Sequence, residues 1–200
     1  MVSKDVPQQT DEYLAAVTIG ARVPLNGAVY LASYDPAWPS KFLLLAGRIR
    51  DALAEKILLL EHVGSTSVPG ISAKPVIDMV LAVSNSADEA AYVPPLAEQG
   101  FALRVREPNW FEHRLLKTPN ADSNLHVFSF GCEEIERMLV FRDWLRAHEE
   151  ERRRYEDVKR ELASRSWRHV QNYADAKSEV VREILGRAGK VLDSSLLPSA

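Results

Sequence analysis

Residues 57–83 read ILLLEHVGSTSVPGISAKPVIDMVLAV, two apolar runs separated by a segment rich in small residues. The first run predicts a strand at about Ile57–His62, and the second predicts a strand at Val76–Val83. Because the second run is almost continuously apolar and rich in β-branched residues, we expect it to be buried on both faces of a sheet. Glycine, proline and serine between the runs indicate a loop, Gly64–Gly70.

The same pattern continues on both sides of this stretch. Three further strands are predicted downstream, at Phe101–Arg106, Glu112–Lys117 and Leu125–Phe130, with turn residues between them. A short strand is predicted upstream, at Val29–Ala32. These runs indicate a mixed β-sheet.

Helical patterns flank the predicted strands. Apolar residues recur every three or four positions between Pro36 and Glu55, after an N-cap at Asp35, and a second helix is expected over Ser86–Gln99. After Gly131 the pattern is helical almost to the end, with two further helices at about 151–164 and 168–188. We therefore expect an α+β fold with a C-terminal helical layer, divided into an N-terminal arm (1–26), one domain (27–190) and a tail (191–200).

Composition narrows the classes of function. The net charge is −3 at pH 7, which gives no overall positive field for DNA or an anionic membrane. Cys132 is the only cysteine, so an intrachain disulfide is excluded and no oxidising compartment is indicated. No signal peptide or membrane span is visible, and a cytoplasmic location is expected.

The loop after the first central strand is the best candidate for chemistry. Backbone N–H groups of a Gly-Ser turn at Gly64 can converge on a phosphate, and the hydroxyls of Ser65, Thr66 and Ser67 can add donors. Taken alone, the same composition also describes an ordinary turn.

Asp78 makes a binding site more plausible than a turn. A carboxylate within the apolar run is costly to bury unless a cation, a metal ion or solvent meets it. A structural ion pair with Lys74, four residues earlier, is the alternative.

Basic residues of the two later strands form a second group. His113, Arg114 and Lys117 lie on one predicted strand and His126 on the next. Strand alternation separates Arg114 from His113 and Lys117. If Arg114 and His126 point over the sheet toward Asp78, they would suit a phosphorylated or carboxylated ligand. An exposed basic face is the alternative.

Basic residues also recur in the C-terminal helices. Arg137, Arg142 and Arg146 are expected to form surface ion pairs, since such pairs are common and nearly neutral in energy. Lys159 and Lys177, with Tyr173, are interpreted in the same way.

Several of these segments together resemble the GrpB family of nucleotidyltransferase-like proteins. The motifs occur in the family's order: YDPxWP at 34–39, EHVGSTSVPG at 61–70, KPVID at 74–78, RxxK at 114–117, NLHVF at 124–128 and FRDxLR at 141–146. The resemblance covers about Val29–Ile184. It implies the minimal nucleotidyltransferase fold, and the family is itself similar to a domain fused to dephospho-CoA kinase.

The wider superfamily implies specific roles for some residues. Gly64 and Ser65 match its phosphate-binding turn, and Asp78 matches the first carboxylate of a centre that binds Mg²⁺ or Mn²⁺. Val80 stands at the second carboxylate position, and His126 lies on the strand that would carry the third. Two-metal transfer needs several oxygen ligands, so Asp78 and His126 by themselves could hold at most one ion. Glu61, His62 and Glu112 are the possible substitutes for the missing ligands.

Three hypotheses follow. The first is metal-dependent nucleotidyl or phosphoryl transfer to a small acceptor, with Asp78 catalytic. In it, the phosphates are held by Gly64, Ser65, Thr66, Ser67, Lys74, Arg114 and Lys117. The second is a non-catalytic module that binds a nucleotide, a CoA-like metabolite or another phosphorylated small molecule, and Val80 favours it over the first. The third is a structural domain whose basic groups only form ion pairs.

Overall fold

A five-stranded mixed sheet forms the centre of the protein. The computed structural model describes residues 10–22 and 25–195. The strands are β1 (Leu59–Val63), β2 (Ile77–Val83), β3 (Ala102–Glu107), β4 (His113–Lys117) and β5 (Ser123–Ser129), in the spatial order β1-β2-β5-β4-β3. The central pair β2–β5 is parallel, and the other pairs are antiparallel. The predicted mixed α+β architecture is confirmed, with all five of these strands at or near their expected positions.

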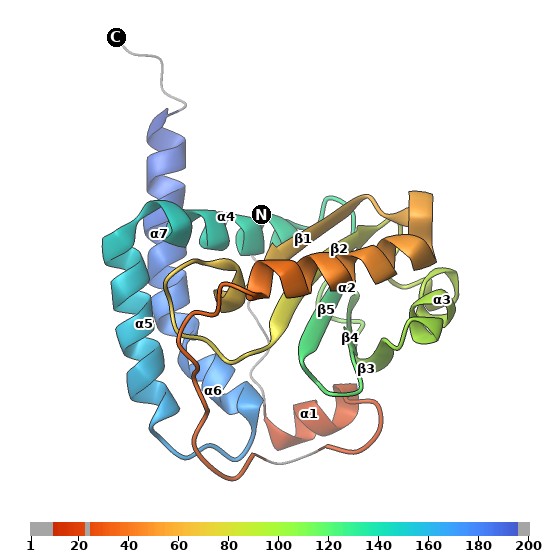
Figure 1. Ribbon diagram of the computed structural model, residues 1–200, viewed down its shortest axis with the longest axis horizontal. Coiled ribbons are helices and arrows are strands. Elements are labelled where there is room, and N and C mark those ends of the chain that lie inside the picture. Colours follow the sequence, from red (N-terminus) through yellow and green to blue (C-terminus); the bar gives the residue numbers. More distant parts are fainter. Residues whose placement is uncertain (1–9, 23–24, 196–200) are drawn as a thin grey trace.

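Strand β2 is covered on both faces, as its apolar run predicts. Ile77, Met79, Leu81 and Val83 pack with residues of α2 (Trp38–Leu53) and α3 (Val93–Glu98). The alternate residues Val80 and Ala82 pack on the other face, against α4 (Glu133–Ala147). Figure 1 shows α2 lying across the sheet.

The C-terminal helices form a layer at one end of the sheet (Figure 1). This layer consists of α4, α5 (Glu149–Ala163), α6 (Val170–Ala176) and α7 (Ser178–Ser195). Val68 and Ile71, from the loop after β1, are buried against Leu145, Tyr155 and Ile184 of these helices. The loop that carries the Gly-Ser turn is thus held between the sheet and the helical layer.

Both ends of the chain contain more regular structure than expected. The predicted N-terminal arm contains α1 (Asp11–Val17), capped by Thr10 and anchored by the buried Leu14. Ile19 N–H then donates to Arg104 O beside β3. The predicted tail is helical as far as Ser195, and its last part, 196–200, lies outside the described residues, as do 1–9 and 23–24 of the arm.

Three local expectations are wrong. Val29–Ala32 is not a strand, because the segment makes only one isolated bridge, between Ala32 and Ala73. The helix expected at about 36–55 is present as α2, but Asp35 is not its N-cap, because Asp35 accepts the Ala37 N–H in the turn that precedes the helix.

The third concerns the expected helix 86–99. This segment consists of a 3-10 turn, Glu89–Ala91, followed by α3. Another short 3-10 turn, Ala54–Lys56, follows α2. Pro94 and Pro95 fall in the first turn of α3, where a missing N–H costs nothing.

No helix within the described ranges is both long enough and apolar enough to cross a membrane.

Cys132 occupies the N-cap position of α4, and no side-chain hydrogen bond caps the helix there. Serine is a strong N-cap because its hydroxyl accepts a backbone N–H of the first turn. We expect the free energy of unfolding of Cys132→Ser, measured in urea, to stay within about 1 kcal/mol of the wild-type value. It should exceed that of Cys132→Ala by roughly 1 kcal/mol. A Cys132→Ser variant less stable than Cys132→Ala would show that the thiol has a role we have missed.

Candidate functional site

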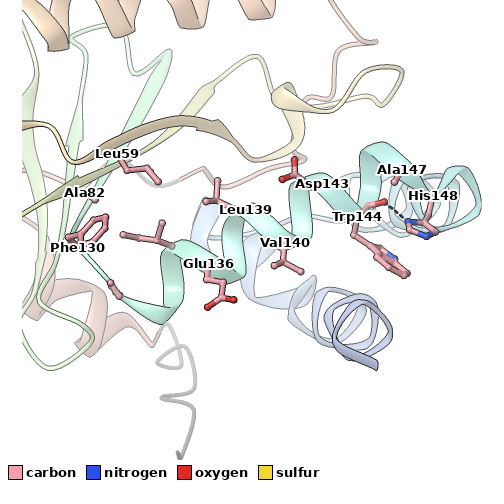
Figure 2. A pocket seen from close by; sticks show the side chains of 13 residues that line it. Leu59, Ala82, Phe130, Glu136, Leu139, Val140, Asp143, Trp144, Ala147 and His148 are labelled. Carbon is pink, nitrogen blue, oxygen red and sulfur yellow. Dashed lines mark hydrogen bonds between the residues drawn. The ribbon is translucent and has the colours of Figure 1, made fainter. Parts of the chain in front are cut away.

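Two hollows lie on the side of the sheet that faces the C-terminal layer. One, of about 520 Å³, follows the outer side of α4. Figure 2 shows its apolar lining, with Leu139, Val140 and Trp144 from the helix, Leu59 from β1 and Phe130 from the turn after β5. The other has a volume of about 460 Å³ and lies between the sheet, α5 and α6. We call it the lysine cavity, because it is lined by Lys74, Lys117, Lys159 and Lys177.

One face of the sheet supplies the cavity's polar floor. Parallel register places Asp78 beside Asn124 and Val80 beside His126, and antiparallel register places Lys117 beside Asn124. Asn124 Nδ2 donates to Asp78 Oδ1 over 2.7 Å. Asp78 and His126 therefore line the same cavity from neighbouring strands.

The Gly64 turn packs directly on Asp78. Gly64 has a φ of +68°, and a Cβ atom added to it would lie 2.5 Å from Asp78 Oδ2. Any side chain at this position would therefore both strain the backbone and displace the carboxylate.

The hydroxyls of this turn are less available than expected. Thr66 Oγ1 donates to Val76 O over 3.1 Å, and Ser67 Oγ donates to Gly64 O over 2.6 Å. Both side chains are buried and hold the turn together, and Ser67 does not line the cavity. Ser65 differs, since its Oγ accepts a hydrogen bond from Lys159 Nζ at 3.3 Å. Of the three expected hydroxyl donors, Ser65 is the one placed beside a cavity cation.

Lys159 is the most unusual of the cavity lysines. It lies on α5 with only 1% of its surface exposed, and its Nζ donates to Ser72 O at 2.5 Å. Burial, reinforced by the charge of Lys177, lowers the pKa of Lys159 to about 7. Lysines with such a pKa change charge near neutral pH.

The other three lysines share one carboxylate. Burial lowers the pKa of Lys74 and of Lys117, and for both the attraction of Asp78 opposes this effect. Burial in turn raises the pKa of Asp78, although Asn124 and the lysines favour its charged form. Asp78 thus faces three lysines, and Glu107, Glu134 and Asp175 also line the cavity.

Two donors on the cavity wall are unpartnered. Tyr173 is 3% exposed and Trp110 is 8% exposed. Neither the Tyr173 hydroxyl nor Trp110 Nε1 has a hydrogen-bond partner among the described residues. Buried donors of this kind are costly unless water or a ligand meets them.

Arg114 does not belong to the site, contrary to expectation. Alternation along β4 turns it away from Lys117 and the cavity, and its Nε donates to Glu89 Oε1 at 2.5 Å. It also contacts Glu112 and is buried. The sequence showed that Arg114 and Lys117 face opposite ways, and the structure decides which of the two faces Asp78.

Two arginines expected to form surface ion pairs do pair with Asp143, and both also support the turn. Arg142 is buried and donates to Glu61 and to His62 O. Arg146 donates two hydrogen bonds to Ser67 O, over 3.0 and 2.8 Å. Arg137 lines the cavity but is held by a bidentate pair with Glu134.

The residues expected to hold Mg²⁺ or Mn²⁺ do not form a suitable set of donors. In residues 10–22 and 25–195, no three His, Cys, Asp or Glu side chains are grouped so as to hold a metal ion. His126 Nδ1 is bonded to His113, and Asp78 is bonded to Asn124. Lysine ammonium groups surround Asp78 where a second and third carboxylate would be needed.

Lys159 was interpreted as a surface residue, but the sequence around it indicates that its side chain is buried. Tyr155, Lys159 and Leu162 recur at intervals of four and three, which is the spacing of the buried stripe of a helix. A lysine on that stripe is either paired or functional. Lys177 carried no comparable signal, because it lies between α6 and α7.

Comparisons with known proteins match a family model, curated proteins and a solved structure. A family model described as GrpB protein matches residues 28–187. A UPF0157 protein of Halalkalibacterium halodurans is 56% identical, with 93% of this chain and 95% of that protein covered. The crystal structure of the conserved protein GrpB from Enterococcus faecalis is similar, with a TM-score of 0.73 and 29% identity over 82% of this chain and 99% of that one.

A more distant similarity involves a named enzyme. Dephospho-CoA kinase of Mycolicibacterium paratuberculosis is 27% identical over 90% of this chain, which spans 51% of the length of that protein.

The low pKa of Lys159 can be tested directly. We expect carbon NMR of its Cε to give a titration midpoint of about 7, and Lys177→Gln to raise that midpoint, because a nearby positive charge is removed. Lys56→Gln is the control, since Lys56 is exposed and bonded to Ala91 O. A Lys159 midpoint near the ordinary lysine value of 10.5 would contradict the burial argument.

Proposed function

The chain belongs to the GrpB family, and from its cavity we propose that it binds a nucleotide or another phosphorylated small molecule. The observation that carries the proposal is the convergence of Lys74, Lys117, Lys159 and Lys177 on one cavity that also holds the Gly-Ser turn.

Charge and size both support an anionic ligand. Lysine ammonium groups are donors without acceptor capacity, and they pair well with phosphate oxygens. A phosphate would also offset the burial and the repulsion by Lys177 that together lower the pKa of Lys159. The volume of about 460 Å³ falls within the usual range of small-molecule sites.

Two uncharged donors of the cavity also favour a ligand with oxygen acceptors. Tyr173 O–H and Trp110 Nε1–H lack partners in the described part of the chain, and both line the cavity. A ligand with several oxygen acceptors would satisfy them together with the lysines.

The relatives suggest which ligands to try first. The similarity to dephospho-CoA kinase, although it covers half of that protein, makes CoA and dephospho-CoA natural candidates beside nucleoside triphosphates.

The geometry supports binding better than metal-dependent transfer. Val80 points into the apolar cluster with Val63 and Phe128, where the superfamily pattern would place a second carboxylate. With lysines rather than acids around Asp78, we derive no transfer step through a metal ion.

The experiment is a thermal-shift screen of nucleoside triphosphates, CoA, dephospho-CoA and inorganic phosphate, with and without Mg²⁺ and Mn²⁺. A ligand that binds only the native state stabilises it by about 2.7 kcal/mol at 100 times its Kd. We expect phosphorylated compounds to raise Tm without added metal. Stabilisation that depends strictly on Mg²⁺ or Mn²⁺ would favour the transferase hypothesis instead.

Charge removal within the cavity should weaken such a ligand. We expect Lys117→Gln and Lys177→Gln each to raise the Kd roughly tenfold or more, because a hydrogen bond to a charged group contributes about 1.5–3 kcal/mol. Lys41→Gln makes the same charge change outside the cavity, on an exposed lysine paired with Asp35, and should leave the Kd unchanged. Calorimetry that gave equal Kd values for all three variants and the wild type would place the ligand elsewhere.

Asp78→Asn separates binding from metal-dependent transfer by the sign of its effect. The amide oxygen can still accept the hydrogen bond of Asn124, so the fold should persist. Removing one negative charge beside three lysines should tighten an anionic ligand. Weaker binding, or loss of a metal-dependent component, would support the transferase hypothesis and oppose ours.

A further inference from the structure

A chain of hydrogen bonds crosses the sheet and ends at the cavity. Tyr13 O–H donates to one oxygen of Glu107. The other oxygen, Oε2, lies 2.5 Å from His113 Nδ1. His113 Nε2 lies 3.0 Å from His126 Nδ1. We call Glu107, His113 and His126 the relay.

The two imidazole rings are nearly parallel, with planes that differ by 20° and centroids 5.1 Å apart. Their nearest nitrogens, His113 Nε2 and His126 Nδ1, are separated by 3.0 Å and form a hydrogen bond. One of these two nitrogens must therefore carry the proton and the other must accept it.

The inner part of the relay is enclosed. Glu107 is 7% exposed and His113 is 4% exposed. Phe128 stacks on His113 with ring centroids 4.7 Å apart, and Trp110 meets it edge-on at 5.2 Å. Packing on two sides holds the His113 ring in one orientation.

With Glu107 as a carboxylate and His113 neutral, one arrangement of protons satisfies every hydrogen bond of the relay. A carboxylate accepts hydrogen bonds and does not donate them, so Glu107 requires the proton of His113 on Nδ1. Neutral His113 then offers a lone pair at Nε2, which requires a proton on His126 Nδ1. The remaining nitrogen of His126, Nε2, is left with a lone pair on a ring that lines the cavity.

The lone pair of His126 Nε2 is an acceptor in a cavity that is lined by many donors. The lysines are donors only, and Trp110 and Tyr173 add two more donors. Phosphate oxygens, which are acceptors, suit those groups and not an imidazole lone pair. A ligand hydroxyl, which can donate, is the group that suits His126 Nε2.

We propose that His126 Nε2 accepts a hydrogen bond from a hydroxyl group of the phosphorylated ligand, and that Glu107 and His113 are positioning residues that hold His126 in this tautomer. The ligand class is a phosphate ester that also carries a free hydroxyl, as sugar phosphates and nucleotides do. The ligand class rests on the proposed function, whereas the tautomer does not.

The tautomer can be read without any ligand. Long-range ¹H–¹⁵N spectra distinguish a protonated from an unprotonated imidazole nitrogen, and we expect His126 to be protonated on Nδ1 and unprotonated on Nε2. His113→Phe, which keeps an aromatic ring but removes the acceptor, should abolish this preference, while His148→Phe should leave it intact. A proton on His126 Nε2 in the wild type, as a doubly protonated His113 would impose, overturns the proposal.

The hydroxyl contact is tested with a matched pair of ligands. Glycerol 3-phosphate and propyl phosphate have the same carbon chain and phosphate, and only the first carries hydroxyls. We expect the wild type to bind glycerol 3-phosphate about fivefold more tightly, and His126→Phe to lose this preference while still binding propyl phosphate.

The possible failures are distinguishable. A preference of the same size in His126→Phe and the wild type overturns the role of His126 and leaves phosphate binding intact. If neither ester binds the wild type, the proposed function fails and the ligand class fails with it. The NMR measurement decides the tautomer in both cases.

Discussion

Much of this structure depends on placing one carboxylate in an apolar sheet. Asp78 lies on β2, whose neighbours in sequence are buried in clusters on both faces. Isolated buried charge is costly, and here the compensation comes from Asn124 on the adjacent parallel strand and from lysines of three separate segments. The absence of a side chain at Gly64 lets the turn close over the same group. These contacts tie the turn, the two central strands and the cavity together.

The C-terminal layer completes the site as well as the core. Its apolar residues cover Val68 and Ile71 of the loop, and the same helix α5 carries Lys159. Arg142 and Arg146 on α4 donate to backbone oxygens of β1 and of the turn. The cavity forms only when the helical layer is correctly docked on the sheet. The inward-facing basic residues of α4 and α5 contribute to this docking, because they bond to the turn and to β1.

Donors and acceptors are unevenly distributed around the cavity. Lysines, with Tyr173 and Trp110, form a large set of donors. The relay from Glu107 through His113 turns His126, in the middle of β5 and two residues from Asn124, into an acceptor among them. The third hypothesis, in which basic groups only form ion pairs, does not account for three lysines that share a single carboxylate.

The sequence was sufficient to predict the strands and to identify the family, because both depend on short continuous stretches of residues. The continuous apolar run 76–83 identifies a doubly covered strand, and the string at 61–70 identifies the GrpB family. Alternation within β4 also separated Arg114 from Lys117, without saying which of them faces Asp78.

Tertiary structure alone decided the membership of the site. Register between β4, β5 and β2 places Lys117 over Asp78 and sends Arg114 to Glu89. Docking of α5 onto the turn buries Lys159, more than eighty residues away in sequence from Ser65, its hydrogen-bond partner. Side-chain type and spacing carry no information on such distant pairings, since these depend on how the strands are ordered and on which face each helix covers.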